Sequence, residues 1–312
     1  MKCLIVDFMH ERTVEFFEGI GLESTYKPEA NREEILKIVG DYEGLVIRSK
    51  TPVDQELIEA GSRLKFVARA GAGIDNLDVD TLQSKGIEVI NAPEGNRNAL
   101  AEHTIGLLMS LLHNIVKSDK EVRKSVWDRE GNRGVELAGK TVGLLGYGYM
   151  GQAFAQKLQP FGCNVLAYDK YKTNYGDSFC KEASLDQVFK ESDIFSIHVP
   201  LTGETNQMID EEFINSFEKN IYIINTARGE VLNMADSCKA LKSGKVIGMA
   251  LDVLENEKIE TLSEEQKSNF QYLIQSGKTI LTPHVAGWSY ESYENISKVL
   301  AEKIAAFKSN MT

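Results

Sequence analysis

A glycine-rich turn between an apolar run and an amphipathic segment constrains the fold of this chain most. Residues 141–151 read Thr-Val-Gly-Leu-Leu-Gly-Tyr-Gly-Tyr-Met-Gly, which places Gly146, Gly148 and Gly151 at G-x-G-x-x-G spacing. The first glycine permits a tight bend, the second lets backbone approach a pyrophosphate, and the third lets the next helix pack closely on the strand. That helix, predicted at 152–159, offers free N–H groups to phosphates. The pattern predicts a dinucleotide-binding turn.

An acidic residue at the end of the next predicted strand, 164–169, supports this interpretation. Asp169 lies 18 residues beyond Gly151, where a carboxylate that accepts hydrogen bonds from a ribose is expected. Such a carboxylate repels a 2′-phosphate, so we expect NAD rather than NADP. Lys170 and Lys172 weaken that preference without reversing it. The alternative is a glycine-rich turn that binds nothing, which gives no reason for an acid at this distance.

The composition indicates a globular protein of more than one domain. The chain has 312 residues, 42% of them hydrophobic, and a net charge of −11. This charge disfavours nucleic acid and anionic membranes as partners, and no apolar run approaches the length of a membrane span. The cysteines are scattered and accompany no histidine cluster, which predicts reduced thiols, no metal site and a cytoplasmic location. The N-terminus leads directly into a predicted strand, so no signal peptide is expected.

Short apolar runs alternate with amphipathic stretches from end to end, which is typical of βα units and parallel sheets. Strands are predicted at 2–7, 44–48, 65–69, 88–91, 141–146, 164–169, 194–199, 221–226, 247–252 and 279–282. Helices are predicted between the first of these at 13–19, 32–39, 53–59 and 79–84. The first series lacks a glycine fingerprint, so it should bind something other than the dinucleotide. The chain is therefore predicted to be an α/β protein with two doubly wound parallel sheets.

Two longer helices determine the expected domain organisation. A helix from 99 to 113, or as far as 124, is too long for one layer of a small domain and should link two domains. The last helix, 290–307, has an apolar side and should pack back on the first domain. We therefore expect a Rossmann NAD-binding domain, 97–284, inserted into a discontinuous flavodoxin-like substrate domain, 1–96 plus 285–312.

The segment 114–138 is charged and carries Trp127 near its middle. An exposed tryptophan in such an arm more often marks an interface than a core. We therefore expect a homodimer that forms through residues 99–138.

Three segments at predicted strand ends carry groups suited to catalysis, and an open α/β sheet binds its ligands at that edge. They are Asn225-Thr-Ala-Arg-Gly-Glu230, Ala250-Leu-Asp-Val-Leu-Glu-Asn-Glu257 and Leu281-Thr-Pro-His-Val-Ala-Gly-Trp288. Further motifs in the same order are Arg69–Asn76, Asn91–Asn96, Ala101–His103 and His198–Thr202. Together with the glycine loop, these strings resemble the D-isomer-specific 2-hydroxyacid dehydrogenases over nearly the whole chain. Within the family the chain is most similar to short phosphoglycerate dehydrogenases that end after the two core domains.

The resemblance implies hydride transfer between NAD and a 2-hydroxy acid, and it assigns three catalytic roles. His284 would take the hydroxyl proton, because imidazole titrates near neutral pH. Glu257 would orient the ring, although Glu255 could serve instead and Lys258 stands where the family usually has proline. Arg228 would hold the substrate carboxylate with a planar fork of donors.

Cofactor contacts implied by the resemblance come from the glycine loop and the later strand ends. The residues are Gly146, Gly148, Tyr149, Met150, Gly151, Asp169, Pro200, Thr226, Ala227, Arg228, Asp252, His284 and Gly287. Asp252 resembles the residue that accepts a hydrogen bond from the nicotinamide amide. His103 and His198 are interpreted as structural, on a helix and on a strand face.

Three cationic residues of the first domain indicate the type of substrate. Arg48 and Lys50 follow one predicted strand and Arg69 ends the next. They could form ion pairs with surface carboxylates, or they could bind the phosphate of 3-phosphoglycerate. In the second case the backbone of Gly71, Ala72 and Gly73, together with Arg228, would bind its carboxylate.

The expected reaction is oxidation of 3-phosphoglycerate to 3-phosphohydroxypyruvate, the first step of serine synthesis. One alternative is a reductase of glyoxylate or hydroxypyruvate, a small anionic 2-keto acid without phosphate. A more distant alternative is an NAD(H)-sensing binding protein similar to the transcriptional corepressors that resemble these enzymes.

Overall fold

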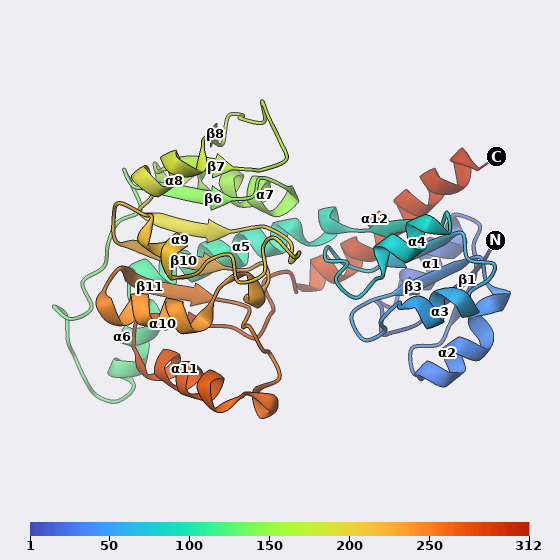
Figure 1. Cartoon of the computed structure of the whole chain (residues 1–312), viewed down its shortest axis with the longest axis horizontal. Coiled ribbons are helices and arrows are strands. Elements are labelled where there is room, and N and C mark those ends of the chain that lie inside the picture. Colours follow the sequence, from blue (N-terminus) through green and yellow to red (C-terminus); the bar gives the residue numbers. More distant parts are fainter. Residues whose placement is uncertain (312) are drawn as a thin grey trace. The chain divides into compact units, whose positions relative to one another are not determined.

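The computed structural model describes residues 1–311 and divides the chain into two compact units (Figure 1). Unit 1 comprises Met1–Asn98 and the segment from Trp288, and unit 2 comprises Ala99–Gly287. The predicted boundaries, 96/97 and 284/285, lie two and three residues from those of the structure. The assignment of substrate to one unit and cofactor to the other stays a prediction.

Unit 1 is built on a five-stranded parallel sheet of order β2-β1-β3-β4-β5. The strands are β1 (Lys2–Ile5), β2 (Glu23–Tyr26), β3 (Gly44–Ile47), β4 (Phe66–Arg69) and β5 (Glu88–Asn91). The sequence prediction included four of them and missed β2. This strand lies at the sheet edge and reads Glu-Ser-Thr-Tyr, with side chains partly or fully exposed. An edge strand needs no continuous apolar run, so the pattern that identified the others is absent.

The helices of unit 1 cover the sheet, and four of them begin at a side-chain N-cap. They are α1 (Thr13–Gly19), α2 (Arg32–Ile38), η1 (Val39–Asp41), α3 (Gln55–Ala60), α4 (Val79–Ser84) and α12 (Tyr290–Asn310). Asn31 forms a capping box with Glu34 at the start of α2. Helix α12 buries Ile296, Leu300 and Ile304 in the core that it shares with α1, which confirms the expectation that the C-terminal helix packs on the first domain (Figure 1).

Unit 2 is built on a seven-stranded parallel sheet of order β12-β11-β10-β9-β6-β7-β8. The strands are β6 (Thr141–Leu145), β7 (Asn164–Tyr168), β8 (Lys181–Glu182), β9 (Ile194–Ile197), β10 (Ile221–Asn225), β11 (Val246–Leu251) and β12 (Thr279–Leu281). Six of these were predicted, and the two-residue edge strand β8 was missed. The chain order reverses between β6 and β9, which is where an open sheet of this kind binds its ligand.

The helices of unit 2 lie on both faces of this sheet (Figure 1). They are α6 (Ile115–Val122), α7 (Tyr149–Leu158), η2 (Gln159–Phe161), α8 (Leu185–Glu191), α9 (Glu211–Asn215), η3 (Gly229–Val231), α10 (Met234–Ser243), η4 (Ile259–Thr261) and α11 (Glu264–Gln275). Both faces of the sheet are apolar, since separate clusters of buried side chains lie on its two sides. The near-continuous apolar runs of the central strands follow from this double covering.

Helix α5 (Pro93–Leu112) belongs to both units and begins six residues before the predicted start at 99. The first turn was not predicted from the sequence, because Pro93 and Gly95 are residue types that usually interrupt a helix. Proline is nevertheless favourable at the first helical position. The helix ends before Asn114, whose φ of +54° separates α5 from α6. Among residues 1–311 no single helix could cross a membrane by length and hydropathy, and α5 and α6 meet those criteria only as a pair bent by 61°.

Gly95 lets α5 approach α12 within unit 1. A Cβ placed on Gly95 would lie 2.6 Å from the Cα of Ile296. We expect Gly95→Ala to lower the free energy of unfolding by about 1–3 kcal/mol, because backbone atoms must move apart. Gly106→Ala, on the same helix, is the control, since its Cβ would meet no atom within 4 Å. It should raise stability slightly by its helix propensity. Equal thermal unfolding midpoints for the two variants would contradict this account.

Candidate active site

The glycine loop has the geometry that the motif requires. Gly146 has a φ of +93°, and a Cβ there would lie 2.7 Å from the carbonyl oxygen of His198. A Cβ on Gly151 would lie 2.3 Å from the oxygen of Gly146, so this residue lets α7 pack against the turn. Gly148 is the N-cap of α7 and supplies no side chain to its first amides. A Cβ on Gly148 would meet no protein atom within 4 Å, so the backbone there is accessible to a phosphate.

Asp169, directly after β7, contacts the glycine loop. One carboxylate oxygen accepts from the backbone N–H of Tyr147 at 2.9 Å, and the other accepts from that of Tyr171 at 3.0 Å. Tyr149 and Met150 form the first turn of α7 beside them. The structure therefore brings together the predicted phosphate-binding turn and the predicted ribose-binding acid.

His284 and Glu257 lie in contact, on the loops that follow β12 and β11. The Nδ1 of His284 lies 2.8 Å from the Oε1 of Glu257, and both side chains are about half exposed. The backbone of His284 has a φ of +55°, which is uncommon outside glycine. Such backbone persists only where its surroundings hold it in place.

Asp252, at the end of β11, holds the loop that carries His284. Its carboxylate is buried and accepts from Thr282 Oγ1 at 2.5 Å, from Val285 N at 3.0 Å and from Ala286 N at 2.8 Å. Its backbone oxygen accepts from His284 N at 2.7 Å. Asp252 thus contacts the loop on both sides of His284. The sequence singled this residue out only for the nicotinamide amide, and that contact stays a prediction.

Arg228 lies on the loop after β10, next to the loop that carries Glu257. The side chain of Asn225 is buried and bonds both Arg228 O and Ala227 N, which shapes the turn. A Cβ on Gly229 would lie 2.0 Å from the backbone of Leu254. The two loops can therefore touch only because residue 229 is glycine.

Glu255 was the alternative partner of His284, and its side chain points to another residue. Its Oε1 accepts from Gln207 Nε2 at 3.2 Å. Burial, together with the nearby Glu230 and Glu265, raises the pKa of Glu255. The structure thus places Glu257 and not Glu255 against the imidazole.

The two histidines that the sequence analysis interpreted as structural, His103 and His198, differ in their surroundings. His198 is buried against the Phe154 ring and contacts Ser196 Oγ at 2.9 Å, and burial lowers its pKa to about 4. It is therefore neutral at physiological pH. His103 contacts Thr282 Oγ1 at 3.2 Å and lies 3.6 Å from Asp252, so it adjoins the loop that carries His284. No local pattern in the sequence indicated that contact.

The other predicted cofactor residues lie on loops after the same strands. Thr226 is buried and its hydroxyl lies 3.3 Å from that of Thr104. Pro200 lies on the loop after β9, where its carbonyl oxygen accepts from the Thr205 hydroxyl at 2.7 Å. Gly287 is the last residue of unit 2. These positions agree with a cofactor site at the carboxyl edge of the sheet, but no described contact tests it.

Arg48, after β3 in unit 1, is held by aromatic rings. Its guanidinium lies 3.8 Å from the Trp288 ring centroid and 5.2 Å from that of Tyr293. Its backbone N–H donates to the buried carboxylate of Asp7 at 2.7 Å. These ring contacts were not foreseen from the sequence.

The other predicted substrate residues also follow β3 and β4. The Lys50 ammonium lies 3.5 Å from the carbonyl oxygens of Pro28 and Ala30. The Arg69 guanidinium lies beside Gly71, where a Cβ would be 1.7 Å from Nη1. Ala72 O accepts from Asn91 at 2.6 Å, which fixes the loop that also contains Gly73. Arg48 therefore contacts aromatic rings, and the ammonium of Lys50 lies near backbone carbonyl oxygens.

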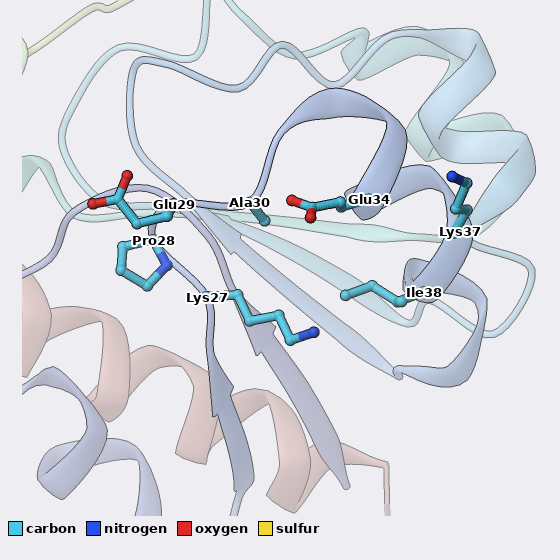
Figure 2. Close-up of a pocket in the computed structure, with 7 residues that line it drawn as sticks. All are labelled: Lys27, Pro28, Glu29, Ala30, Glu34, Lys37 and Ile38. Carbon is cyan, nitrogen blue, oxygen red and sulfur yellow. The ribbon is translucent and has the colours of Figure 1, made fainter.

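A surface pocket of about 420 Å³ in unit 1 adjoins Lys50, because Pro28 and Ala30, whose carbonyl oxygens lie 3.5 Å from the Lys50 ammonium, are among its lining residues. Figure 2 shows Lys27, Glu34, Lys37 and Ile38 around it, on α2 and the segment before it. It contains none of the predicted site residues. Among residues 1–311 no group of three or more His, Cys, Asp or Glu side chains is placed to hold a metal ion.

Together, the sheet order, the glycine turn and the strand-end residues define an α/β protein with a dinucleotide-binding domain. The sequence profile of the D-isomer specific 2-hydroxyacid dehydrogenase NAD binding domain matches residues 105–286. The chain therefore belongs to the D-isomer-specific 2-hydroxyacid dehydrogenase family.

Relatives of different substrate classes match this chain to a similar degree. The D-3-phosphoglycerate dehydrogenase of Archaeoglobus fulgidus is 35% identical over 97% of the chain, but the match covers only 56% of that protein. The chain thus spans little more than half the length of such relatives. The hydroxypyruvate reductase of Thermotoga maritima is 36% identical, with 88% of the chain and 87% of that protein covered.

A solved structure shares the fold of both units. The D-lactate dehydrogenase of Aquifex aeolicus, solved with NAD and lactic acid, matches with a TM-score of 0.83. The match has 29% identity and covers 99% of this chain and 96% of that one. It confirms the predicted fold class.

Gly229 allows a direct test of the contact between the loops that carry Arg228 and Glu257. We expect Gly229→Ala to lower kcat/KM by at least about tenfold, because a displacement near 1 Å at a reacting group costs about that much or more. Steady-state kinetics with NADH and a 2-keto acid would measure it. Gly106→Ala serves as the control with the same added methyl. Unchanged kinetics for Gly229→Ala would show that the spacing of the two loops does not matter.

Proposed function

We propose that this protein catalyses the NAD-dependent interconversion of a D-2-hydroxy acid and its 2-keto acid. The observation that carries the proposal is the contact of His284 with Glu257 at 2.8 Å, in the NAD-binding domain of a dehydrogenase family. Arg228 lies on the neighbouring strand-end loop, which Gly229 brings against that of Glu257. The arrangement combines an acid–base group, its orienting carboxylate and a cation.

His284 would transfer the proton through Nε2. Its Nδ1 faces Glu257, and a carboxylate accepts hydrogen bonds, so this contact selects the tautomer with the proton on Nδ1. The unprotonated Nε2 is then ready to accept the hydroxyl proton as the hydride leaves the substrate carbon for the nicotinamide. In the reverse direction the same nitrogen donates the proton.

Arg228 would bind the substrate carboxylate and polarise the carbonyl oxygen. Its planar guanidinium can donate two parallel hydrogen bonds to a carboxylate, which the ammonium of lysine cannot reproduce. The glycine loop would bind the pyrophosphate of NAD, and Asp169 would accept from the ribose hydroxyls. Each group then acts on a different part of the reacting complex.

We propose 3-phosphoglycerate as the substrate, which would place the enzyme in serine synthesis. Support comes from Arg48, Lys50 and Arg69 at neighbouring strand ends of an acidic protein. The rings of Trp288 and Tyr293 contact the Arg48 guanidinium, whose N–H donors suit a phosphate. The Archaeoglobus fulgidus relative favours the same substrate.

A second candidate is reduction of hydroxypyruvate or glyoxylate. The Thermotoga maritima hydroxypyruvate reductase supports it, because that protein is 36% identical to this chain, a value similar to that of the phosphoglycerate dehydrogenase. In that case the cations of unit 1 would not need to bind a phosphate. An NADH-binding protein without turnover remains the third candidate.

The homodimer expected through residues 99–138 also stays a proposal. Exposed apolar side chains along α6 and the segment after it support it, namely Ile115, Val122, Val126 and Trp127, the last 80% exposed. We expect the protein in the cytoplasm, since all four cysteines are unpaired thiols.

Comparison of phosphohydroxypyruvate with hydroxypyruvate tests the substrate. We expect a higher kcat/KM for the phosphorylated acid, and we expect Arg48→Met to remove most of that advantage while sparing hydroxypyruvate. Loss of a charge-assisted contact of this kind costs about 1.5–3 kcal/mol, or about 10- to 100-fold. Arg63→Met, at an exposed site of the same unit, is the control. A wild-type preference for hydroxypyruvate would favour the second candidate.

His284→Ala tests the chemistry. We expect kcat to fall by about 10²- to 10⁴-fold, the usual contribution of a positioned acid–base group. The Kd for NADH, measured by fluorescence titration, should stay nearly the same, because the imidazole serves proton transfer and contributes little to cofactor affinity. A large loss of NADH binding, or a retained kcat, would contradict the assignment. Intact NADH binding by the wild type without turnover on any 2-keto acid would favour the binding-protein candidate.

A further inference from the structure

Glu204 contacts the side chains of Lys170 and Tyr171, the two residues that follow Asp169, the predicted ribose-binding acid. Its Oε2 lies 2.8 Å from the Lys170 ammonium and accepts from the Tyr171 hydroxyl at 2.6 Å. Lys170 and Tyr171 come directly after Asp169, and Glu204 lies on the loop after β9. The strands β7 and β9 flank β6, which leads into the glycine loop. The cluster of Lys170, Tyr171 and Glu204 therefore borders the predicted adenosine end of the dinucleotide site.

This cluster is also joined to Asp169 itself. The backbone N–H of Tyr171 donates to Asp169 at 3.0 Å, while its hydroxyl donates to Glu204. One residue thus connects the acid that would accept from the ribose to the acid that holds Lys170. The contact with Glu204 raises the pKa of Lys170, so this lysine is charged and paired.

NADP differs from NAD by a phosphate on the same ribose, and a site that accepts NADP supplies a cation there. Lys170 and Lys172 are the cations nearest to Asp169 in sequence. The ammonium of Lys172 donates to the carbonyl oxygen of Tyr147 at 2.7 Å, and Lys170 is held by Glu204. Each lysine thus already has a partner within the protein, and the negative charge of Glu204 repels a phosphate.

We propose that Glu204 is a specificity-determining residue that excludes NADP by holding Lys170 away from the 2′-phosphate. This inference rests on the cofactor site proposed above and goes beyond it, because Asp169 alone explains the preference for NAD in that proposal. Lys170 and Glu204 are both more than half exposed. Substitution of Glu204 removes the carboxylate that pairs with Lys170, so its ammonium is free to reach a phosphate on the neighbouring ribose.

Direct binding measurements on Glu204→Gln test the proposal without any 2-keto acid. We expect the ratio of the Kd for NADPH to that for NADH to fall by about tenfold, since a repulsive charge is removed and a cation is released near a dianion. The Kd for NADH should change by less than about twofold. Glu264→Gln is the control, because it removes an equally charged partner from Lys267 on α11. It should leave the ratio unchanged.

The double variant Glu204→Gln, Lys170→Met identifies the cation. It should return the Kd for NADPH toward the wild-type value. An unchanged ratio in Glu204→Gln, or a gain that persists without Lys170, would overturn the proposal. Wild-type protein that binds neither nucleotide would instead refute the cofactor site on which the proposal rests, so the two failures can be told apart.

Discussion

The buried carboxylate of Asp252 is the constraint on which the candidate catalytic site depends. A left-handed backbone at a residue other than glycine costs about 1–2 kcal/mol, and His284 adopts one at φ +55°. Hydrogen bonds from Thr282, Val285 and Ala286 to Asp252 hold the loop in this shape. Because the carboxylate is buried, each of these hydrogen bonds offsets part of the free-energy cost of removing its charge from water. The imidazole is thereby presented to Glu257 before any substrate arrives.

Parallel strand order explains why groups far apart in sequence share this edge. The loops with Arg228, Glu257 and His284 follow β10, β11 and β12, which are successive neighbours in the sheet. All three strands point the same way, so their carboxyl ends meet at one edge. The glycine loop follows β6 at the same edge, and its helix start provides donors for phosphates. The loops of Arg228 and Glu257 lie in contact because residue 229 is glycine, since a side chain there would separate them.

Sequence reasoning predicted what depends on local pattern and missed what depends on long-range contacts. Buried strands have continuous apolar runs and were found, whereas the polar edge strands β2 and β8 have no such pattern. The glycine spacing indicated the turn from residue types alone. The choice of Glu257 over Glu255 depends on where a loop of several residues places each side chain, which spacing does not determine. The stacking of Arg48 on Trp288 and the pairing of Lys170 with Glu204 join distant residues, and no local signal reveals them.

The central claim is that His284 and Glu257 act as one unit in proton transfer. A double-mutant cycle on kcat, with His284→Ala, Glu257→Gln and the combined variant, measures their coupling directly. If the carboxylate serves only through the imidazole, its loss should matter little once His284 is gone. The account therefore predicts a combined variant whose kcat is within about threefold of that of His284→Ala. Losses that multiply, so that the combined variant falls by the product of the two single effects, would show that the residues act independently and would contradict it.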